Sequence, residues 1–272
     1  MSVNVDAVLL SDRVTDALAD ARRHMRLADG ALQDADEAIG RSEADINELP
    51  QQARLVLQHE VPRVPLENAQ SYADQVFRRL GGAQEEVNDA VRRLDQSAQA
   101  IGTARSALQE LEQLTPGAEG SGQEEWPKDV PTVAELRERV ELFDEALTAA
   151  TEGAEDAGWR LGKARDSLRT LLTSGTYIDD RQQTAQMIAE AGSNVGRETR
   201  AAHDEIKGLG QPFYNADQDS AAALSGASDL HNAVRAGLNP TPRSQQTTPG
   251  ATVEDPRVAW SQGRDVGQGI DR

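Results

Sequence analysis

The chain has 272 residues, of which only 3% are aromatic, and its formal net charge is −18 at pH 7. With so few aromatic side chains, Ala, Leu, Val and Ile must supply the buried surface, which favours closely packed helices over a β-sandwich or a deep catalytic pocket. The negative charge repels phosphate backbones, so we do not expect nucleic acid as a partner. Cysteine is absent, which excludes disulfides and thiol chemistry.

The first residues lack the features of a signal peptide or a membrane span. In "MSVNVDAVLLSD" there is no basic segment, and the apolar run over 7–10 ends at Ser11. Both kinds of segment need a longer run, so we expect a cytoplasmic protein without membrane insertion. Of the 28 basic residues only three are lysine, a composition typical of a high-GC bacterium.

The first helix is indicated by apolar residues that alternate at spacings of four and three from Val14 to Ile46. This heptad pattern predicts one apolar seam along a supercoiled helix. We expect the helix over about 6–49, ended by Pro50, with a kinked extension or a short separate helix over 51–60. The seam consists of Val14, Leu18, Ala21, Met25, Ala28, Leu32, Ala35, Ile39, Ser42 and Ile46.

The same alternation returns twice and predicts long helices over about 66–114 and 132–173. Thr132 and Glu135 have the spacing of a capping box at the start of the third long helix. The second seam is Ala73, Val76, Leu80, Ala83, Val87, Ala90, Leu94, Ser97, Ile101, Ala104, Leu108 and Leu111. The third seam is Val133, Leu136, Val140, Phe143, Leu147, Ala150, Ala154, Ala157, Leu161, Ala164, Leu168 and Leu171.

Three glycines, Gly40, Gly102 and Gly162, each follow a large residue of a seam. A missing side chain at this flank leaves room for another helix, and we expect packing or chance to explain these glycines. The alternative is a ligand or partner that approaches the bare backbone.

A weaker pattern from Ala185 to Leu209 predicts a fourth helix over about 182–210. We expect Pro212 to break this arm and a shorter helix to follow over 217–236. The apolar positions of that last segment are Leu224, Ala227, His231 and Val234.

The connectors are too short for parallel neighbours. A helix over 6–49 has 44 residues and is about 66 Å long, whereas the segment 51–65 spans about 51 Å even when fully extended. The sequence therefore predicts an all-α fold, an elongated antiparallel helical bundle or coiled coil of three to four long helices over 1–238. The segment 239–272 has no periodicity and is rich in Pro, Gly, Ser, Thr and Gln, so we expect a disordered tail.

No pattern indicates a catalytic, cofactor or metal site. Carboxylate-bridged di-metal bundles need Glu-x-x-His, and none of the four histidines has an acidic residue three positions before it. The phosphate-binding, nucleophile-elbow and zinc-helix motifs are missing as well. We expect no catalytic residue, no cofactor, no metal and no enzymatic activity. His24 and His203 are expected to be solvated or flanking, and His231 to be a core residue.

Two tryptophans are candidate contact sites for a protein partner. Trp159 lies between the seam residues Ala157 and Leu161, so its indole should point away from the seam. It then marks a partner site, or else the short helix after Pro50 or the broken fourth arm covers it. Trp260 is a lone tryptophan in the polar tail, where it is either a short linear motif or a chance occurrence.

Two functions remain after these exclusions. The first is a non-enzymatic structural or interaction protein that presents its helical faces and a flexible C-terminal arm to protein partners, with a homo-oligomer left open. The alternative is a leaderless substrate or helper of a specialised, type VII-like bacterial secretion system, secreted without a cleavable signal peptide. The Trp-x-Gly turn of the best-known substrates is missing, since Trp126 precedes Pro127 and Lys128, and Trp159 precedes Arg160 and Leu161.

Overall fold

The computed structural model describes residues 5–114, 127–173 and 180–237. The chain divides into two units, 1–241 and 242–272, and all described residues belong to the first. The predicted tail disorder over 239–272, with Trp260, lies outside the described residues. The helices of the described part are α1 (Val5–Gly40), α2 (Glu43–Gln58), α3 (Arg63–Leu114), α4 (Val133–Thr173), α5 (Arg181–Gly208) and α6 (Gly210–Arg235).

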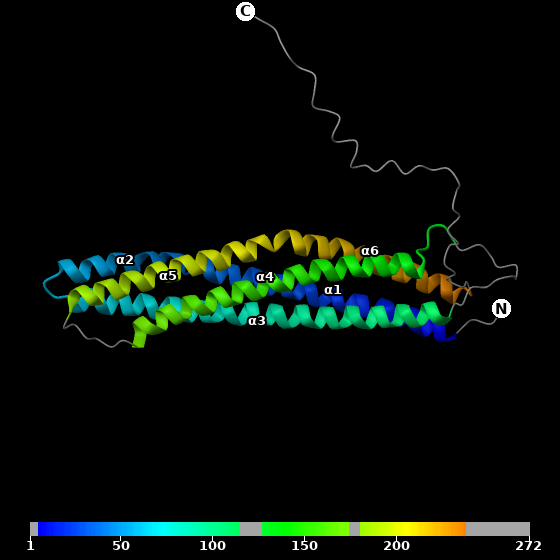
Figure 1. The fold of residues 1–272 in the computed structure, drawn as a ribbon, viewed down its shortest axis with the longest axis horizontal. Coiled ribbons are helices and arrows are strands. Elements are labelled where there is room, and N and C mark those ends of the chain that lie inside the picture. The colour runs from blue at the N-terminus through cyan, green and yellow to red at the C-terminus, as the bar shows by residue number, and fades with distance from the viewer. Residues whose placement is uncertain (1–4, 115–126, 174–179, 238–272) are drawn as a thin grey trace, which may run out of the picture. The chain divides into compact units, whose positions relative to one another are not determined.

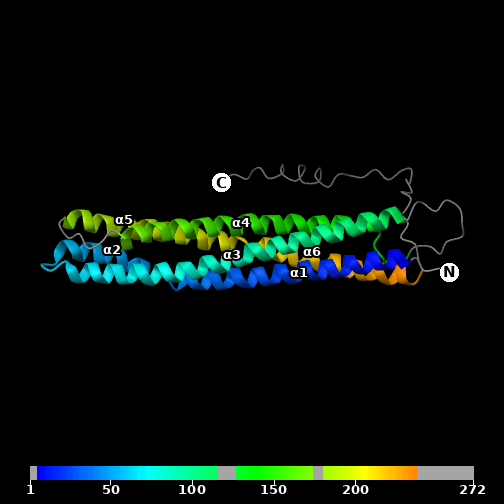
Figure 2. The ribbon, with the colours of Figure 1, turned by 90° about the horizontal axis from the view of Figure 1, so that it is seen from below.

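These helices form the four antiparallel arms of one bundle (Figures 1 and 2). The first arm is α1 followed by α2, the second is α3, the third is α4, and the fourth is α5 followed by α6. The first arm packs against α3, α3 against α4, α4 against the fourth arm, and the fourth arm against the first. The all-α antiparallel bundle predicted from the sequence is confirmed.

The heptad seams form the core of the bundle. Every residue of the first three predicted seams is buried. The fourth-arm pattern is buried as well, at Ala185, Ile188, Gly192, Val195, Thr199, Ala202, Ile206 and Leu209. Among the polar seam residues, Thr199 Oγ1 has no hydrogen-bond partner in the described part of the chain, whereas Ser97 and Ser42 are hydrogen-bonded. Ser97 Oγ donates to the Ala21 carbonyl of α1 at 2.8 Å. Ser42 Oγ donates to the Ala38 carbonyl at 3.0 Å. These bonds remove the penalty of burying a hydroxyl group.

The first arm breaks at a place that the sequence did not reveal. The predicted helix over 6–49 is wrong, because Arg41 and Ser42 form a turn and α2 then runs through Pro50 to Gln58. The Ser42 amide donates to the Ile39 carbonyl at 2.9 Å, a tighter three-residue bond that ends α1. The segment expected over 51–60 is therefore the second half of α2. Packing of α2 against α3 and α5 keeps it helical on both sides of the proline.

The fourth arm also breaks at an unpredicted position. Pro212 was expected to interrupt the arm, but it lies in the first turn of α6, which begins at Gly210. Proline is tolerated there because the amides of a first turn have no acceptor within the helix. The break lies instead at Leu209, whose amide donates to the Ile206 carbonyl at 3.1 Å. For the same reason α3 starts at Arg63, ahead of the predicted residue 66, with Pro65 in its first turn.

The register predicted for the last segment is partly wrong. Leu224 and His231 are only half-buried, whereas their neighbours Ala223 and Leu230 are fully buried. Adjacent apolar residues satisfy either phase of the pattern, so contact with α1 and α4 decides which face turns inward. The buried residues of α6 are Phe213, Ala216, Ser220, Ala223, Gly226, Ala227, Leu230, Ala233 and Val234.

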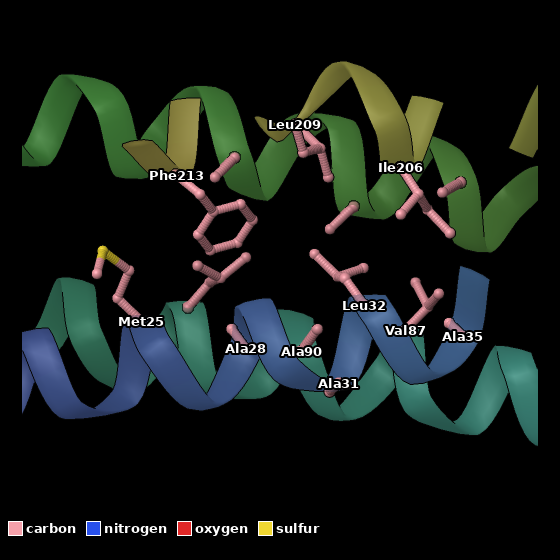
Figure 3. Packing of buried hydrophobic residues seen from close by; sticks show 14 of the residues in the cluster. Met25, Ala28, Ala31, Leu32, Ala35, Val87, Ala90, Ile206, Leu209 and Phe213 are labelled. Carbon is pink, nitrogen blue, oxygen red and sulfur yellow. The ribbon is translucent and has the colours of Figure 1, made fainter. Parts of the chain in front are cut away.

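The α5–α6 break is filled by large side chains. Figure 3 shows Ile206, Leu209 and Phe213 of the fourth arm pointing towards Met25 and Leu32 of α1. All of these side chains are buried. The break therefore lies inside the core, and its conformation is set by packing against the first arm.

The glycines that admit a neighbouring arm are not the predicted ones. A Cβ atom at Gly40 or Gly102 would meet nothing within 4 Å, so of the two expected explanations, packing and chance, packing does not apply to either glycine. At Gly162 a Cβ would only touch Gln84 Nε2, at 3.4 Å. The close approach occurs at Gly153, where a Cβ would lie 2.5 Å from Leu209 Cδ2, and at Gly192, where it would lie 3.0 Å from Leu49 Cβ.

The predicted capping box starts α4. The Glu135 amide donates to Thr132 Oγ1 at 3.2 Å, and the Thr132 amide donates to Glu135 Oε2 at 2.8 Å. Both bonds satisfy amides that have no helical acceptor. The box fixes the beginning of the helix that carries Trp159.

Candidate functional site

Two of the four histidines, His203 and His231, make contacts between the arms. Ser11 Oγ lies 3.0 Å from His231 Nδ1 and donates to the Val8 carbonyl at 2.9 Å. The contact between Ser11 and His231 joins α1 to α6. His203 pairs with Asp36 and links α5 to α1. His231 is half-buried, not a full core residue.

Within the described ranges, no group of three or more His, Cys, Asp or Glu residues is placed to hold a metal ion. None of the helices described there has an apolar stretch that is long enough to cross a membrane.

Trp159 lies on the outward face of α4 and is 54% exposed. Neither α2 nor the fourth arm covers it, so the covering alternative is wrong. The neighbouring residues Ala157 and Leu161 are fully buried, as their seam positions predict. The fold thus leaves a large aromatic ring in solvent on the third arm.

Two cations lie against the Trp159 ring. Lys163 Nζ is 3.5 Å from the ring centroid, and Arg160 Cζ is 5.1 Å from it. Lys163 follows the tryptophan by one helical turn, the spacing at which side chains on a helix surface meet. A cation over an indole face is attracted by the ring quadrupole, and this contact favours the orientation that the exposed tryptophan has in the structure.

Arg160, which contacts the ring, also pairs with a buried carboxylate of α5. Glu198 is only 6% exposed, and it accepts hydrogen bonds from Arg160 at 3.3 Å and from Arg197 at 3.1 Å. Burial raises the pKa of Glu198, but the bonds and charges of the two arginines and of Lys163 outweigh burial and lower the pKa below its ordinary value. The ion pairs fix α4 against α5 next to Trp159.

The lowered pKa of Glu198 predicts a pH-dependent contribution to stability. A carboxylate with a depressed folded pKa stabilises the fold above its unfolded value, near 4.5, and the contribution is lost as pH falls through the folded pKa. We expect Glu198→Gln to have a lower melting temperature than the wild type at pH 7, and the gap to close towards pH 3.

Melting curves followed by circular dichroism across this range measure the gap. Glu138→Gln is the matched control, since it removes one charge from an exposed position of α4 that makes no ion pair in the described part of the chain. A gap for Glu198→Gln that stays constant with pH contradicts the prediction.

On the other side of Trp159 a shallow groove of about 470 Å³ separates α4 from α3. Its floor is a close approach of the two helices, because a Cβ at Gly158 would lie 3.3 Å from Val87 Cγ1. Gln84 Nε2 donates to the Gly158 carbonyl at 3.3 Å. Trp159 forms one wall of this groove.

The charges along α4 change sign at Trp159. The segment 152–156 contains three acids and no base, whereas 157–165 contains three bases and no acid. In the described part of the chain, no ion pair is formed by Glu152, Glu155, Asp156 or Lys163. We define the Trp159 surface as the outward residues Glu155, Asp156, Trp159, Gly162 and Lys163.

The outward position of Trp159 was predicted from the sequence because it lies outside the seam, but its two cations were missed. The spacing of Trp159 and Lys163 carried that signal, whereas the role of Arg160 depends on Glu198 of another arm. Comparison of the chain with protein-family models, with curated proteins and with solved structures finds no match.

Proposed function

We propose that the protein is a non-enzymatic interaction protein that binds a protein partner through the Trp159 surface. The observation that carries this proposal is that Trp159 is exposed on the outward face of α4, where Lys163 and Arg160 contact its ring. Tryptophan and arginine are the residues most enriched at the energetic centres of protein interfaces.

Burial of Trp159 by a partner would supply binding energy at a small cost in side-chain conformational entropy. Lys163 and Arg160 already contact the ring in the free chain, and a side chain with such contacts loses less rotamer freedom on binding than a fully mobile one. Fully burying a large aromatic side chain contributes about 1.5–3 kcal/mol.

We expect Trp159→Ala to abolish capture of the partner by the tagged full-length chain. Truncation of a central tryptophan weakens binding by about 2 kcal/mol or more, roughly 30-fold. Capture from a lysate of the native cells, followed by mass spectrometry, measures the loss.

Leu142→Ala is the matched control. Leu142 is 52% exposed on the same helix, but it does not belong to the Trp159 surface. Both replacements are on an exposed face, so circular dichroism should show folded bundles. Recovery of the same proteins by the wild type and by Trp159→Ala contradicts the proposal.

A further inference from the structure

We infer that the partner of the Trp159 surface is a second copy of this chain, docked with its α4 antiparallel to the first. This inference rests on the proposed function and names the partner for the same surface. It is carried by the order of the exposed charges on either side of Trp159.

A two-fold axis is the usual symmetry of a homodimer. When the axis passes through a residue of an antiparallel helix pair, positions that lie equally far before and after that residue come to face each other across the two copies. With the axis at Trp159, the two indoles meet at the centre. Glu155 precedes Trp159 by four residues and Lys163 follows it by four. Glu155 therefore lies opposite the partner's Lys163, and Lys163 lies opposite the partner's Glu155.

The neighbouring positions are mixed. Asp156 lies opposite the partner's Gly162, where the missing side chain leaves room. Glu152 lies opposite the partner's Asp166, so this pair is of like charge and occurs twice in the dimer. Within the chain Asp166 is ion-paired with Arg169 at 3.1 Å, which offsets part of its charge. Two unlike-charge pairs therefore flank the central aromatic contact, and two like-charge pairs lie about one helical turn further from it.

Partners of uniform charge fit this surface less well. An acidic segment would face the carboxylates of Glu155 and Asp156, and a basic segment would face Lys163. Like charges placed opposite each other oppose binding. A complementary partner must place a basic group opposite Glu155 and an acidic group opposite Lys163. An antiparallel copy of α4 does both, because its own Lys163 and Glu155 take these positions.

The contact is expected to be weak and concentration-dependent. One helix face on each copy is a small interface of the kind found in transient complexes. Each copy also carries a net charge of −18, but at about 0.15 M salt this repulsion is screened beyond about 8 Å. The dimerisation should therefore be measured at about 0.15 M salt and over a wide range of protein concentration.

Sedimentation equilibrium of the full chain tests the inference. We expect the wild-type mass to rise from 29.3 kDa towards twice that value as concentration increases. Lys163→Glu and Glu155→Lys each place like charges opposite each other twice in a symmetric dimer, and each should weaken dimerisation at least tenfold. Trp159→Ala should do the same.

The decisive result is the behaviour of the two charge variants together. In an equimolar mixture of Lys163→Glu with Glu155→Lys, both charge pairs are unlike again, so dimerisation should return to the wild-type level. The same holds for the double variant. Leu142→Ala should dimerise like the wild type. Leu142 precedes the axis at Trp159 by more residues than α4 has after it, since α4 ends at Thr173, so no residue of the partner's α4 faces Leu142.

Three results would overturn the inference: a wild-type mass that stays at 29.3 kDa, charge variants that dimerise like the wild type, or a mixture that stays monomeric. The failure of the broader proposal looks different. A monomeric chain that still loses a captured protein on Trp159→Ala excludes the second copy and keeps the interaction function. Capture that is independent of Trp159, together with no dimer, removes both.

Discussion

Replacing Phe143 with alanine is expected to lower the free energy of unfolding by about 3–5 kcal/mol. Phe143 is among the largest fully buried side chains and lies in the α4 seam. The loss combines the transfer energy of the ring with the cavity left among side chains that relax only in part. Urea unfolding followed by circular dichroism measures the change.

Leu142 gives the matched control for Phe143, because it is the preceding residue of the same helix and is 52% exposed. Leu142→Ala should change the free energy of unfolding by less than about 0.5 kcal/mol. The pair tests the phase of the helix directly. Equal effects at the two positions would show that α4 does not turn the face of Phe143 inward.

Introducing leucine at Gly192 is expected to destabilise the bundle by about 2–3 kcal/mol. A Cβ there would lie 3.0 Å from Leu49 Cβ and 3.3 Å from Pro50 Cδ. These atoms are next to the backbone of α2 and cannot turn away as the end of a flexible side chain can. The larger residue must therefore push α2 and α5 apart.

Gly102 is the control for this overpacking. It also lies inside a helix, α3, but a Cβ there would meet nothing within 4 Å. Gly102→Leu should stabilise the protein by up to about 1 kcal/mol, since leucine has a higher helix propensity than glycine. The two substitutions should thus have opposite signs in the same urea experiment, and the same sign would contradict the packing of α2 on α5.

The candidate site could be predicted from the sequence only in part. The position of Trp159 between two seam residues predicts that its ring points outward, and the structure places it there. Whether another arm covers the ring depends on contacts between distant segments, which the spacing along one helix does not report. The buried Glu198 was missed for the same reason, since it lies among arginines of two different helices.

The helical class, the antiparallel order of the arms and the buried residues of the long seams could all be predicted from the sequence. These features follow from a local period of about 3.5 residues and from connectors too short to return along a helix. Tertiary packing decided where the arms break. Pro50 and Pro212 mark sites where a helix is weakened, but contacts of α2 with α5 and of Leu209 with the core placed the breaks at Arg41–Ser42 and at Leu209. A proline alters local backbone energy by a few kcal/mol, and burial of several side chains from a neighbouring arm outweighs it.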